Sequence, residues 1–491
     1  MKTISLIRSF AFLSFLLCGA IQSIAENIEV DGVYYDYGSD FAWVTGCTDD
    51  VTDINIPEII TLEDEGYTFS LPVRYIENGA FRFKNNIQSA VINSKYIYEE
   101  AFYGCTGLET LIIGNESNSG IIIYDHAFTY CTGLKTVNLG KSVRSLRVGA
   151  FGFCMSLEDL MLSEGLKTIG SEAFGFCVSL TTIDFPSTLE TIGNSAFGAD
   201  SSLVSVTFPA GLKEIGDMAF ALCYSLHSID IPRTVTKIGN SAFGGCYNLS
   251  AITVEPGNYY YDSRDNCNAI IEKASKTLIA GCINTVIPNT VINIADNAFN
   301  RVGFESIIIP NSVVNIGEYA FYKCDRANDI KIGTSVKIIG NNAFRDCSNL
   351  RSLKLERSVE EIHMGAFMGC PLEVVTSLNP SPPRCNRDKW NDDDMFDWAY
   401  GGCLYVPKGC KEAYLENYGD DNNCHWYRFY EIKEIDFRAD VNDDGEVNIA
   451  DINAVIDMIL SDKFKTRGDV NNDGDVNIAD INAIIDSIFK G

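Results

Sequence analysis

Basic residues are scarce in this chain. Its 491 residues include 38 lysines and arginines against 66 aspartates and glutamates, a formal net charge of -28. The basic residues form no cluster along the sequence. Nucleic acids and anionic membranes are bound through such clusters, which neutralise phosphates. The sequence therefore argues against both as partners.

After its first residues the chain has no long apolar run. A helix that spans a membrane would need about 20 consecutive apolar residues. The first 25 residues instead have the pattern of a secretory signal. Lys2 and Arg8 supply the basic part, residues 10–20 the short apolar part, and residues 23–25 a small-residue cleavage site. We expect residues 1–25 to be removed, leaving a secreted, extracellular protein that starts at residue 26.

Membrane attachment stays open through one residue. Cys18 lies in the signal segment, where lipidation is an alternative to cleavage after residue 25. Leu17 directly precedes Cys18, whereas the signal of bacterial lipoproteins has a small residue at this place. We therefore expect a soluble mature protein without membrane insertion, with cell-surface association left open.

Short motifs typical of enzymes are missing as well. The sequence contains no GxSxG, HExxH, GxGxxG or P-loop spacing. Its four histidines recur near no particular cysteine, so nothing marks a thiol nucleophile with its base. They are His126, His227, His363 and His425. A pair of catalytic carboxylates stays open from sequence alone, but we predict that the protein is not an enzyme.

What the chain does have is a repeat. At 491 residues it exceeds the roughly 250 to 300 residues at which a single core stops growing. The dipeptide Ala-Phe recurs, mostly every 23 residues, and the clearest repeats span residues 166–188, 189–211 and 212–234. Its twelve copies begin at Ala80, Ala101, Ala127, Ala150, Ala173, Ala196, Ala219, Ala242, Ala298, Ala320, Ala343 and Ala366.

Each repeat has apolar residues at fixed places. In residues 166–188 the segment from Leu180 to Phe185 alternates at its end like a short half-buried strand, and Pro186 ends it. The Ala-Phe segment suits one helical or 3-10 turn. A single repeat cannot bury its apolar face, so neighbouring repeats must stack. The sequence predicts a solenoid of about thirteen coils.

The repeat pattern IGxxAFxxCxxLxxIxIPxx resembles the BspA-like leucine-rich repeats of bacterial surface proteins, over roughly residues 75–435. This resemblance implies short parallel strands joined by helical or 3-10 turns, and a role in adhesion or host interaction. One departure is Pro in place of the usual Asn after the strand. Another is residues 255–290, which break the register; we interpret them as a packed variant coil, with a functional protrusion as the alternative.

The solenoid needs covers at both ends. We expect residues 26–74 to form an N-terminal cap, residues 75–370 the solenoid, and residues 371–437 a C-terminal cap and linker.

Cysteines follow the repeat. Nine lie three residues after the repeated Phe, where Lys84, Asp200 and Val302 stand in other coils. Such a set with single gaps favours a ladder of buried free thiols over disulfides. The nine are Cys105, Cys131, Cys154, Cys177, Cys223, Cys246, Cys324, Cys347 and Cys370. Candidates for disulfides remain elsewhere: Cys267 with Cys282, and some of Cys385, Cys403, Cys410 and Cys424.

The last 52 residues carry a duplicated twelve-residue loop, starting at Asp440 and again at Asp469. Calcium takes six to eight oxygen ligands, and loop positions 1, 3, 5, 7, 9 and 12 offer them, with glycine at position 6 for the sharp turn. We predict two calcium ions. The expected ligands are Asp440, Asn442, Asp444, Glu446, Asn448 and Asp451 in the first loop, and Asp469, Asn471, Asp473, Asp475, Asn477 and Asp480 in the second. Position 7 would act through its backbone carbonyl and position 9 through water.

Each loop is followed by a helix, with apolar residues at helical spacing over residues 450–460 and 479–489, and neither is preceded by one. Position 12 is Asp rather than the Glu of an EF-hand. A loop plus one helix, twice, resembles a type I-like dockerin, which places a small all-α calcium-binding module at residues 438–491. The resemblance implies a cohesin-bearing partner that contacts loop positions 10 and 11. Those positions are Ile449, Ala450, Ile478 and Ala479, apolar where better-known dockerins often carry hydroxyls.

Together these features predict a secreted, non-catalytic adhesion protein. The solenoid would present its surface to an extracellular protein ligand, and the dockerin-like module would bind a cohesin. Predicted outward strand positions such as Thr182, Ser205 and Lys354 are mixed and polar, which suits a protein ligand.

The alternative is a carbohydrate-binding accessory subunit of a polysaccharide-degrading complex. Aromatic residues near the C-terminal cap and in the variant coil favour it, although such residues more often pack inside a cap. They are Trp390, Trp398, Tyr400, Trp426 and Tyr427, with Tyr259 to Tyr261.

Overall fold

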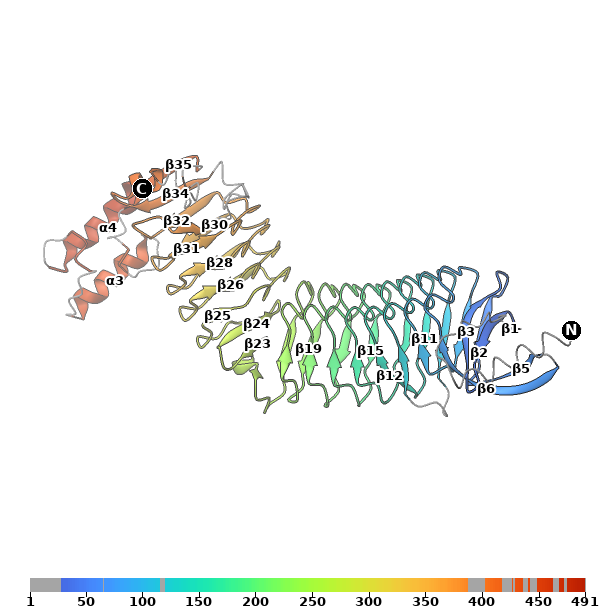
Figure 1. Cartoon of the computed structure of the whole chain (residues 1–491). Helices are drawn as coiled ribbons and strands as arrows, with labels where there is room; N and C mark the ends of the chain where they lie inside the picture. The colour runs from blue at the N-terminus through green and yellow to red at the C-terminus, as the bar shows by residue number, and fades with distance from the viewer. Residues whose placement is uncertain are drawn as a thin grey trace, which may run out of the picture.

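The computed structural model shows a β-solenoid of about 13 turns followed by two helices (Figure 1). This number of turns matches the repeat count, and confirms the predicted fold class. The structure describes residues 28–64, 66–114, 120–386, 402–416, 426, 429–435, 440–441, 448–461, 468–471 and 475–490. The signal segment and Cys18 lie outside these residues. Within them, no helix combines the length and apolar character needed to cross a membrane.

The first strands fold back on one another before the regular coils begin. β1 (Ile28–Val30) and β3 (Ala42–Cys47) lie antiparallel on either side of β2 (Val33–Tyr37), while β5 (Ile59–Asp64) lies antiparallel to β6 (Tyr67–Ile76). β3 pairs with β6 in parallel, and β4 (Asp53–Ile56) starts a second sheet. Val33, Tyr35 and Val44 are fully buried, so these strands cover the apolar end of the solenoid.

Every regular coil then contributes to two parallel sheets. The first, containing the predicted strands, consists of β7 (Ser89–Ile92), β9 (Thr110–Ile113), β11 (Thr136–Asn138), β13 (Asp159–Met161), β15 (Thr182–Asp184), β17 (Ser205–Thr207), β19 (Ser228–Ile231) and β21 (Ala251–Val254). The second consists of β8 (Tyr96–Ile97), β10 (Ile121–Ile123), β12 (Val143–Leu146), β14 (Thr168–Ile169), β16 (Thr191–Ile192), β18 (Glu214–Ile215) and β20 (Lys237–Ile238). The sequence did not predict the second sheet, because most of its strands have only two residues and show no alternation of apolar and polar residues.

The Ala-Phe segment forms the third side of each coil as a turn. Its hydrogen bonds include a local one from the Cys177 N–H to the Phe174 carbonyl, 3.2 Å, as in a 3-10 turn. The Phe174 N–H donates to the carbonyl of Ala196 in the next coil, 2.8 Å. Glu172 and Phe176 have positive φ angles of 56° and 63°, so the predicted turn never continues into a helix.

The core is a stack of equivalent side chains from successive coils. Phe151, Phe174 and Phe197 are fully buried, and their rings lie parallel with centroids 5.3 and 5.4 Å apart. Leucine and isoleucine from the strands pack beside them in the same way. Stacking neighbouring coils therefore buries an apolar face that no single coil could cover.

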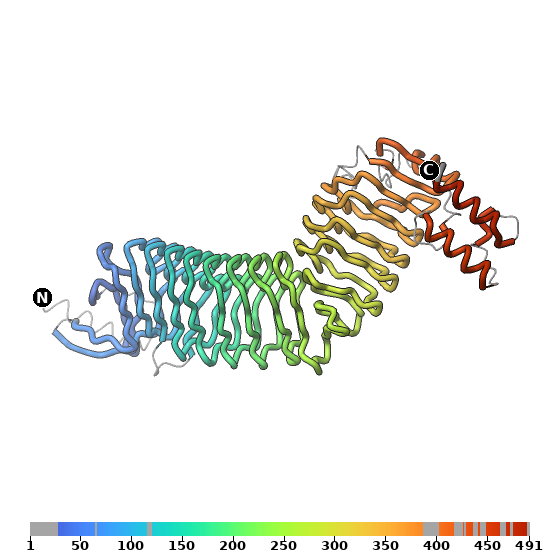
Figure 2. Tube along the Cα trace, turned by 180° about the vertical axis from the view of Figure 1, so that it is seen from behind, coloured from blue at the N-terminus to red at the C-terminus, as the bar shows by residue number. Residues whose placement is uncertain are grey.

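The variant coil divides the solenoid into two arrays with separate hydrophobic clusters. β22 (Tyr261–Asp262) and the 3-10 helix η1 (Arg264–Asn266) lead into a hairpin of β23 (Ala269–Glu272) and β24 (Thr277–Gly281). Ile270 and Ile271 are fully buried, which confirms a packed coil. Figures 1 and 2 show that the solenoid axis turns here, a bend that the sequence did not predict.

The second array repeats the same arrangement. Its strands are β25 (Asn293–Ile294), β26 (Ser306–Ile308), β27 (Asn315–Ile316), β28 (Asp329–Lys331), β29 (Ile338–Ile339), β30 (Ser352–Leu355), β31 (Glu361–His363), β32 (Val374–Ser377), β33 (Arg384–Asn386), β34 (Cys403–Pro407) and β35 (Glu431–Ile435). Beside β35 lies α2 (Lys411–Leu415), whose Tyr414 packs edge-on against Trp426; both rings are buried. The end of the solenoid is thus closed by aromatic residues.

Candidate functional site

The C-terminal helices α3 (Ile449–Leu460) and α4 (Ile478–Lys490) begin in the same way. Asn448 Oδ1 accepts from the Ala450 N–H at 2.7 Å, and Asp451 Oδ2 accepts from the Asn448 N–H at 2.8 Å. At α4, the Ala479 and Asn477 N–H groups donate to Asn477 and Asp480, both at 2.8 Å. Each loop thus ends in a reciprocal capping box that ties position 9 to position 12.

The carboxylates at the loop ends are withdrawn from solvent. Asp451 and Asp480 at position 12 have no exposed surface, and Asp440 at position 1 is 5% exposed. Asp480 Oδ1 also accepts from the Asn471 N–H, 3.1 Å. A buried carboxyl group is stabilised by hydrogen bonds, by a cation or metal ion, or by taking up a proton. An oxygen-only donor set with buried carboxylates fits calcium, the hard cation that prefers such ligands.

The remaining predicted ligands are only partly placed. Asp469 and Asn477 are half-buried, while Asn471 and Asp475 are exposed. Asn442, Asp444, Glu446 and Asp473 lie outside the described residues. Within the ranges that are described, no three His, Cys, Asp or Glu side chains gather as metal ligands would, but these ranges leave out the middle of both loops.

The two helices pack on each other through equivalent positions. Val455 of α3 and Ile484 of α4 are fully buried and join Val441 and Val470 in a small core separate from the solenoid. Predicted apolar positions further along, such as Ile459, are more than a third exposed. A core this small supplies little stability by itself.

The predicted partner face lies at the helix starts. Ile449 is 71% exposed and Ile478 is 72% exposed, while Ala450 and Ala479 are half-buried. Equivalent loops thus display the same apolar side chain to solvent. Both side chains are thus available for contact with a partner.

The cysteine ladder is present as predicted. All nine thiols are free and buried, and each donates to the carbonyl of a Phe in the preceding coil at 3.0 to 3.5 Å. Examples are Cys105 to Phe81 and Cys370 to Phe344, both 3.0 Å. Burial raises the pKa of the Cys246 thiol to about 12. These thiols are therefore core donors and not nucleophiles.

Outside the ladder, the disulfide candidates divide. Cys267 and Cys282 are buried free thiols, so the pair considered from sequence is not formed. Cys403 and Cys410 are also free. Cys385 is in a disulfide, whose partner lies outside the described residues, as does Cys424.

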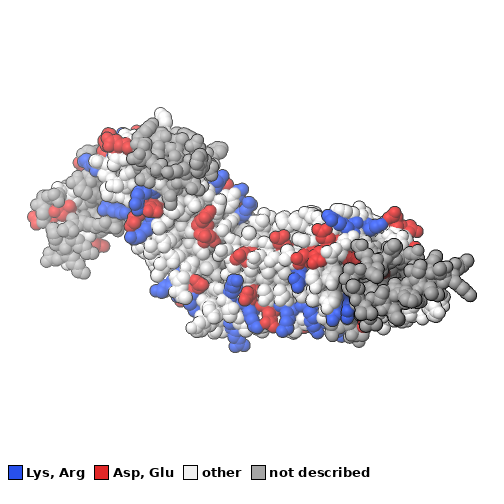
Figure 3. All heavy atoms as spheres, in the orientation of Figure 1, with Lys and Arg blue, Asp and Glu red and all other residues white. Residues whose placement is uncertain are grey.

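The solenoid surface is mixed in charge, as the sequence predicted. On the face shown in Figure 3, basic and acidic side chains alternate along both arrays. Ion pairs join adjacent coils, among them Lys135 with Glu109 at 3.0 Å and Lys337 with Glu360 at 2.8 Å. The outward strand positions Thr182 and Ser205 are exposed, and Lys354 is half-buried. Among the residues that the structure describes on the face in Figure 3, basic side chains form no stripe.

Sequence reasoning missed an aromatic row on the turn side. The row consists of Phe83, Tyr103, Tyr130, Phe153 and Phe176, one from each of five successive coils. The signal was available in the residue before the ladder cysteine, which is aromatic in several early repeats. The outward strand positions, such as Thr182 and Ser205, carry no corresponding aromatic residues.

Comparison with known proteins supports this description. The BspA type leucine rich repeat region family matches residues 65–177, 167–271 and 279–380, and the dockerin type I domain family matches residues 438–489. A search of curated proteins finds no match.

Solved structures share the fold. A leucine rich cell surface protein from Faecalibacterium prausnitzii A2-165 is 24% identical, with 83% of this chain and 94% of that one covered and a TM-score of 0.56. The pneumococcal vaccine antigen PcpA is 19% identical, with 84% and 99% covered and a TM-score of 0.52. Both matched families are non-catalytic binding or structural modules. With more than half of its residues matched by the repeat family, the chain belongs to the BspA type leucine-rich-repeat proteins and carries a type I dockerin domain.

Proposed function

We propose that this protein is a secreted, non-catalytic adhesion protein. Its solenoid presents a surface to an extracellular protein ligand, and its dockerin, at residues 438–491, attaches it to a cohesin-bearing partner. The proposal is carried by the matched exposure of Ile449 and Ile478 at the starts of α3 and α4. The signal pattern of residues 1–25 supports export, and the mixed polar strand faces support a protein ligand.

Two calcium ions complete the dockerin in this proposal. One ion is held by the loop from Asp440 to Asp451 and the other by the loop from Asp469 to Asp480. Each loop brings three carboxylates together, and these repel one another until a divalent cation offsets their charge. Calcium thereby fixes the starts of the helices, where the partner face lies.

Ile449 with Ala450, and Ile478 with Ala479, form two copies of the cohesin-contacting face. Because the loops and helix starts are equivalent, either copy can face the cohesin after the domain turns by half a rotation. The experiment is calorimetric titration of the full chain against cohesins encoded by the same organism. We expect binding in saturating calcium and none after chelation. If no cohesin binds in calcium, the docking proposal fails.

One observation favours the alternative of carbohydrate binding. In the variant coil, Tyr259 is 81% exposed and Tyr260 is 45% exposed, with ring centroids 5.0 Å apart. Exposed aromatic faces are common in sugar recognition. Trp426 gives no such support because it is buried. A glycan array separates the two proposals: glycan binding that Tyr259→Ala removes would favour the alternative.

A further inference from the structure

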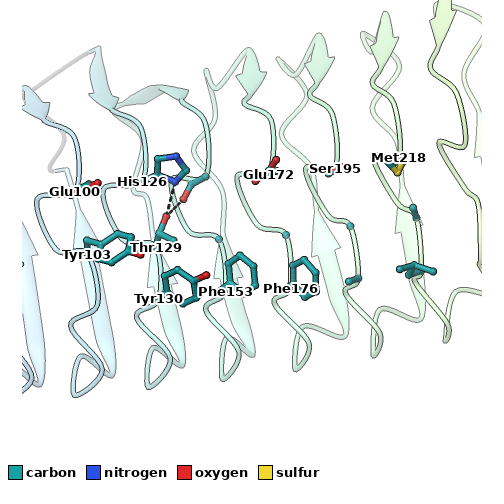
Figure 4. A pocket seen from close by; sticks show the side chains of 17 residues that line it. Glu100, Tyr103, His126, Thr129, Tyr130, Phe153, Glu172, Phe176, Ser195 and Met218 are labelled. Carbon is teal, nitrogen blue, oxygen red and sulfur yellow. Dashed lines mark hydrogen bonds between the residues drawn. The ribbon is translucent and has the colours of Figure 1, made fainter. Parts of the chain in front are cut away.

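A groove follows the turn side of the first array. It has a volume of about 590 Å³ and crosses six coils, from Glu100 to Leu222. One wall is the aromatic row, from Tyr103 to Phe176, and the other wall carries Glu100, His126, Glu172, Ser195 and Met218 (Figure 4). With coils about 4.8 Å apart, the groove is roughly 24 Å long. Its shape suits a single extended chain.

The floor is open because it lacks side chains. Gly152, Gly175 and Gly198 occupy the position after the repeated Phe in three successive coils. In the second array the same position carries Tyr322, Arg345 and Met368. The backbone accepts large residues at this position, so the open floor is a property of this sequence and not of the fold.

The aromatic wall is likewise not required by the fold. Tyr130, Phe153 and Phe176 stand directly before the ladder position, where the second array has Arg301, Lys323 and Asp346. All six have positive φ angles between 53° and 63°. Glycine is least strained there, and Gly369 occupies the equivalent place in another coil. The left-handed turn therefore holds aromatic, charged and small side chains alike, so the aromatic wall is a property of this sequence and not of the fold.

The rings form a continuous strip. Tyr130 and Phe153 lie 4.6 Å apart between centroids with planes at 18°, and Phe153 and Phe176 lie 4.5 Å apart at 6°. Their faces thus lie largely against one another. Tyr130 and Phe176 remain 39% and 46% exposed. A sugar ring stacks on an aromatic face, so this strip fits a glycan less well than a chain that packs between ring edges.

The spacing of the rings selects the form of the chain. Every second ring is about 9 Å along the groove, close to the roughly 9.3 Å of one three-residue turn of polyproline II. In a β-strand, residues on one face repeat every ~6.6 Å, which does not match the coils. Aromatic-lined grooves are also the usual receptors for proline-rich segments, whose rigid backbone loses little entropy on binding.

The charge of the groove indicates which residue accompanies the prolines. Glu172 is exposed on the wall opposite the aromatic row, called the polar wall below, and makes no ion pair with any described residue. Glu100 is paired with Arg82 at 2.8 Å, and His126 Nδ1 lies 3.3 Å from the Thr129 hydroxyl. Glu172 is therefore the carboxylate left to meet a cation on the ligand.

We propose that this groove binds a proline-rich segment of a partner protein, in the polyproline II conformation and carrying an arginine or lysine that pairs with Glu172. The inference rests on the proposed function, because it names the chemistry of the solenoid's protein ligand. Prolines pack between the ring edges, the glycine floor lets the backbone approach, and the basic residue reaches the polar wall.

Fluorescence anisotropy tests this with the full chain. The probe is a labelled peptide of eight prolines with one central arginine, and its partner probe has glutamate in place of arginine. We expect the arginine peptide to bind, and Phe153→Lys or Gly175→Tyr to weaken it roughly tenfold or more, as loss of a central contact does. Both changes introduce residues that Lys323 and Tyr322 already supply at equivalent positions, so the variants should fold.

Matched controls lie in the second array. Lys323→Ala and Tyr322→Gly should leave the peptide affinity unchanged, and Glu172→Gln should reduce the preference for arginine over glutamate. If wild-type protein binds no peptide, if it binds cellohexaose instead, or if Phe153→Lys binds as wild type does, the inference is wrong. The cohesin titration and a screen of wild type against extracellular proteins are run in parallel. A protein ligand found there that still binds Phe153→Lys would leave the proposed function standing without this inference.

Discussion

Asp200 Oδ1 accepts a hydrogen bond from the backbone N–H of Cys177 at 2.7 Å, inside the ladder of buried thiols. Asp200 has no exposed surface, and its Oδ2 has no hydrogen-bond partner among the described residues. Other members of the ladder donate to a carbonyl, which an ionised carboxylate cannot do. Burial raises the pKa of Asp200 well above its usual value, because the charged form of the carboxyl is poorly solvated there.

Replacing Asp200 by cysteine should stabilise the protein. The change restores the ladder residue found in nine other coils and removes a buried polar atom without a partner, a group that costs about 1 to 3 kcal/mol. We expect a higher midpoint in thermal and urea unfolding at pH 7. Asp184→Cys, on an exposed strand position, is the control and should change little. An unchanged or lower midpoint for Asp200→Cys would show that the carboxyl has partners that compensate for its burial.

Asp200 should also make stability depend on pH. Its pKa is raised in the folded state, whereas in the unfolded chain it is near 3.9. The folded state therefore binds the proton more tightly, and the stability this adds is complete below about pH 4 and is lost as pH rises through the folded pKa. Relative to Asp200→Cys, wild type should gain stability between pH 8 and pH 5. Parallel curves for the two proteins would contradict the prediction.

The ladder thiols should resist alkylation in the folded state. They are buried, and burial raises the pKa of Cys154, Cys177 and Cys223, among others. The half-buried Cys403 and Cys410 should react first. Mass spectrometry before and after unfolding measures this. A disulfide between Cys154 and Cys177 would overturn the free-thiol ladder.

The sequence was most informative where one residue type repeats in one environment. Phe174 and its counterparts predicted the stack, and the apolar spacing predicted helices over residues 450–460 and 479–489, each within one residue of α3 and α4. Such regularities arise from burial, because equivalent buried positions take similar residues at a fixed spacing in the sequence.

Features that depend on backbone conformation were not predictable. The left-handed turn at Phe176 leaves no mark in the sequence when an aromatic residue occupies it. The variant coil also packs closely, and a side chain at Gly281 would overlap the ring of Phe299. The groove exists only because the fold places the aromatic wall opposite the wall that carries Glu172. Neither spacing nor composition contains that relationship.

Calcium removal should loosen the dockerin and leave the solenoid intact. Chelation leaves three repelling carboxylates in each loop, so we expect a loss of helical circular dichroism and a lower melting temperature for this domain only. Asp440→Ala and Asp469→Ala should each weaken one calcium site, because each removes the position 1 carboxylate of its loop. Asp451→Ala should lower the melting temperature of the domain more than Asp440→Ala does, since Asp451 also caps α3. Unchanged helicity and melting after chelation would show that the loops fold without the metal.

The partner face should be redundant. Ile449 and Ile478 are equally exposed at equivalent helix starts, so replacing Ile449 by aspartate leaves one orientation available and should weaken cohesin binding only about twofold, the statistical factor of two equal sites. Ile478→Asp should do the same. The double replacement should abolish binding, because each orientation would bury an unpaired charge. Aspartate in the first turn of a helix is well tolerated, so folding should be preserved.

Leu460→Asp, at the opposite end of α3 and 80% exposed, is the control and should bind as wild type does. Calorimetry in saturating calcium measures all four proteins. Full loss of binding from one single replacement would mean that the domain docks in one orientation, and binding retained by the double variant would place the cohesin face elsewhere.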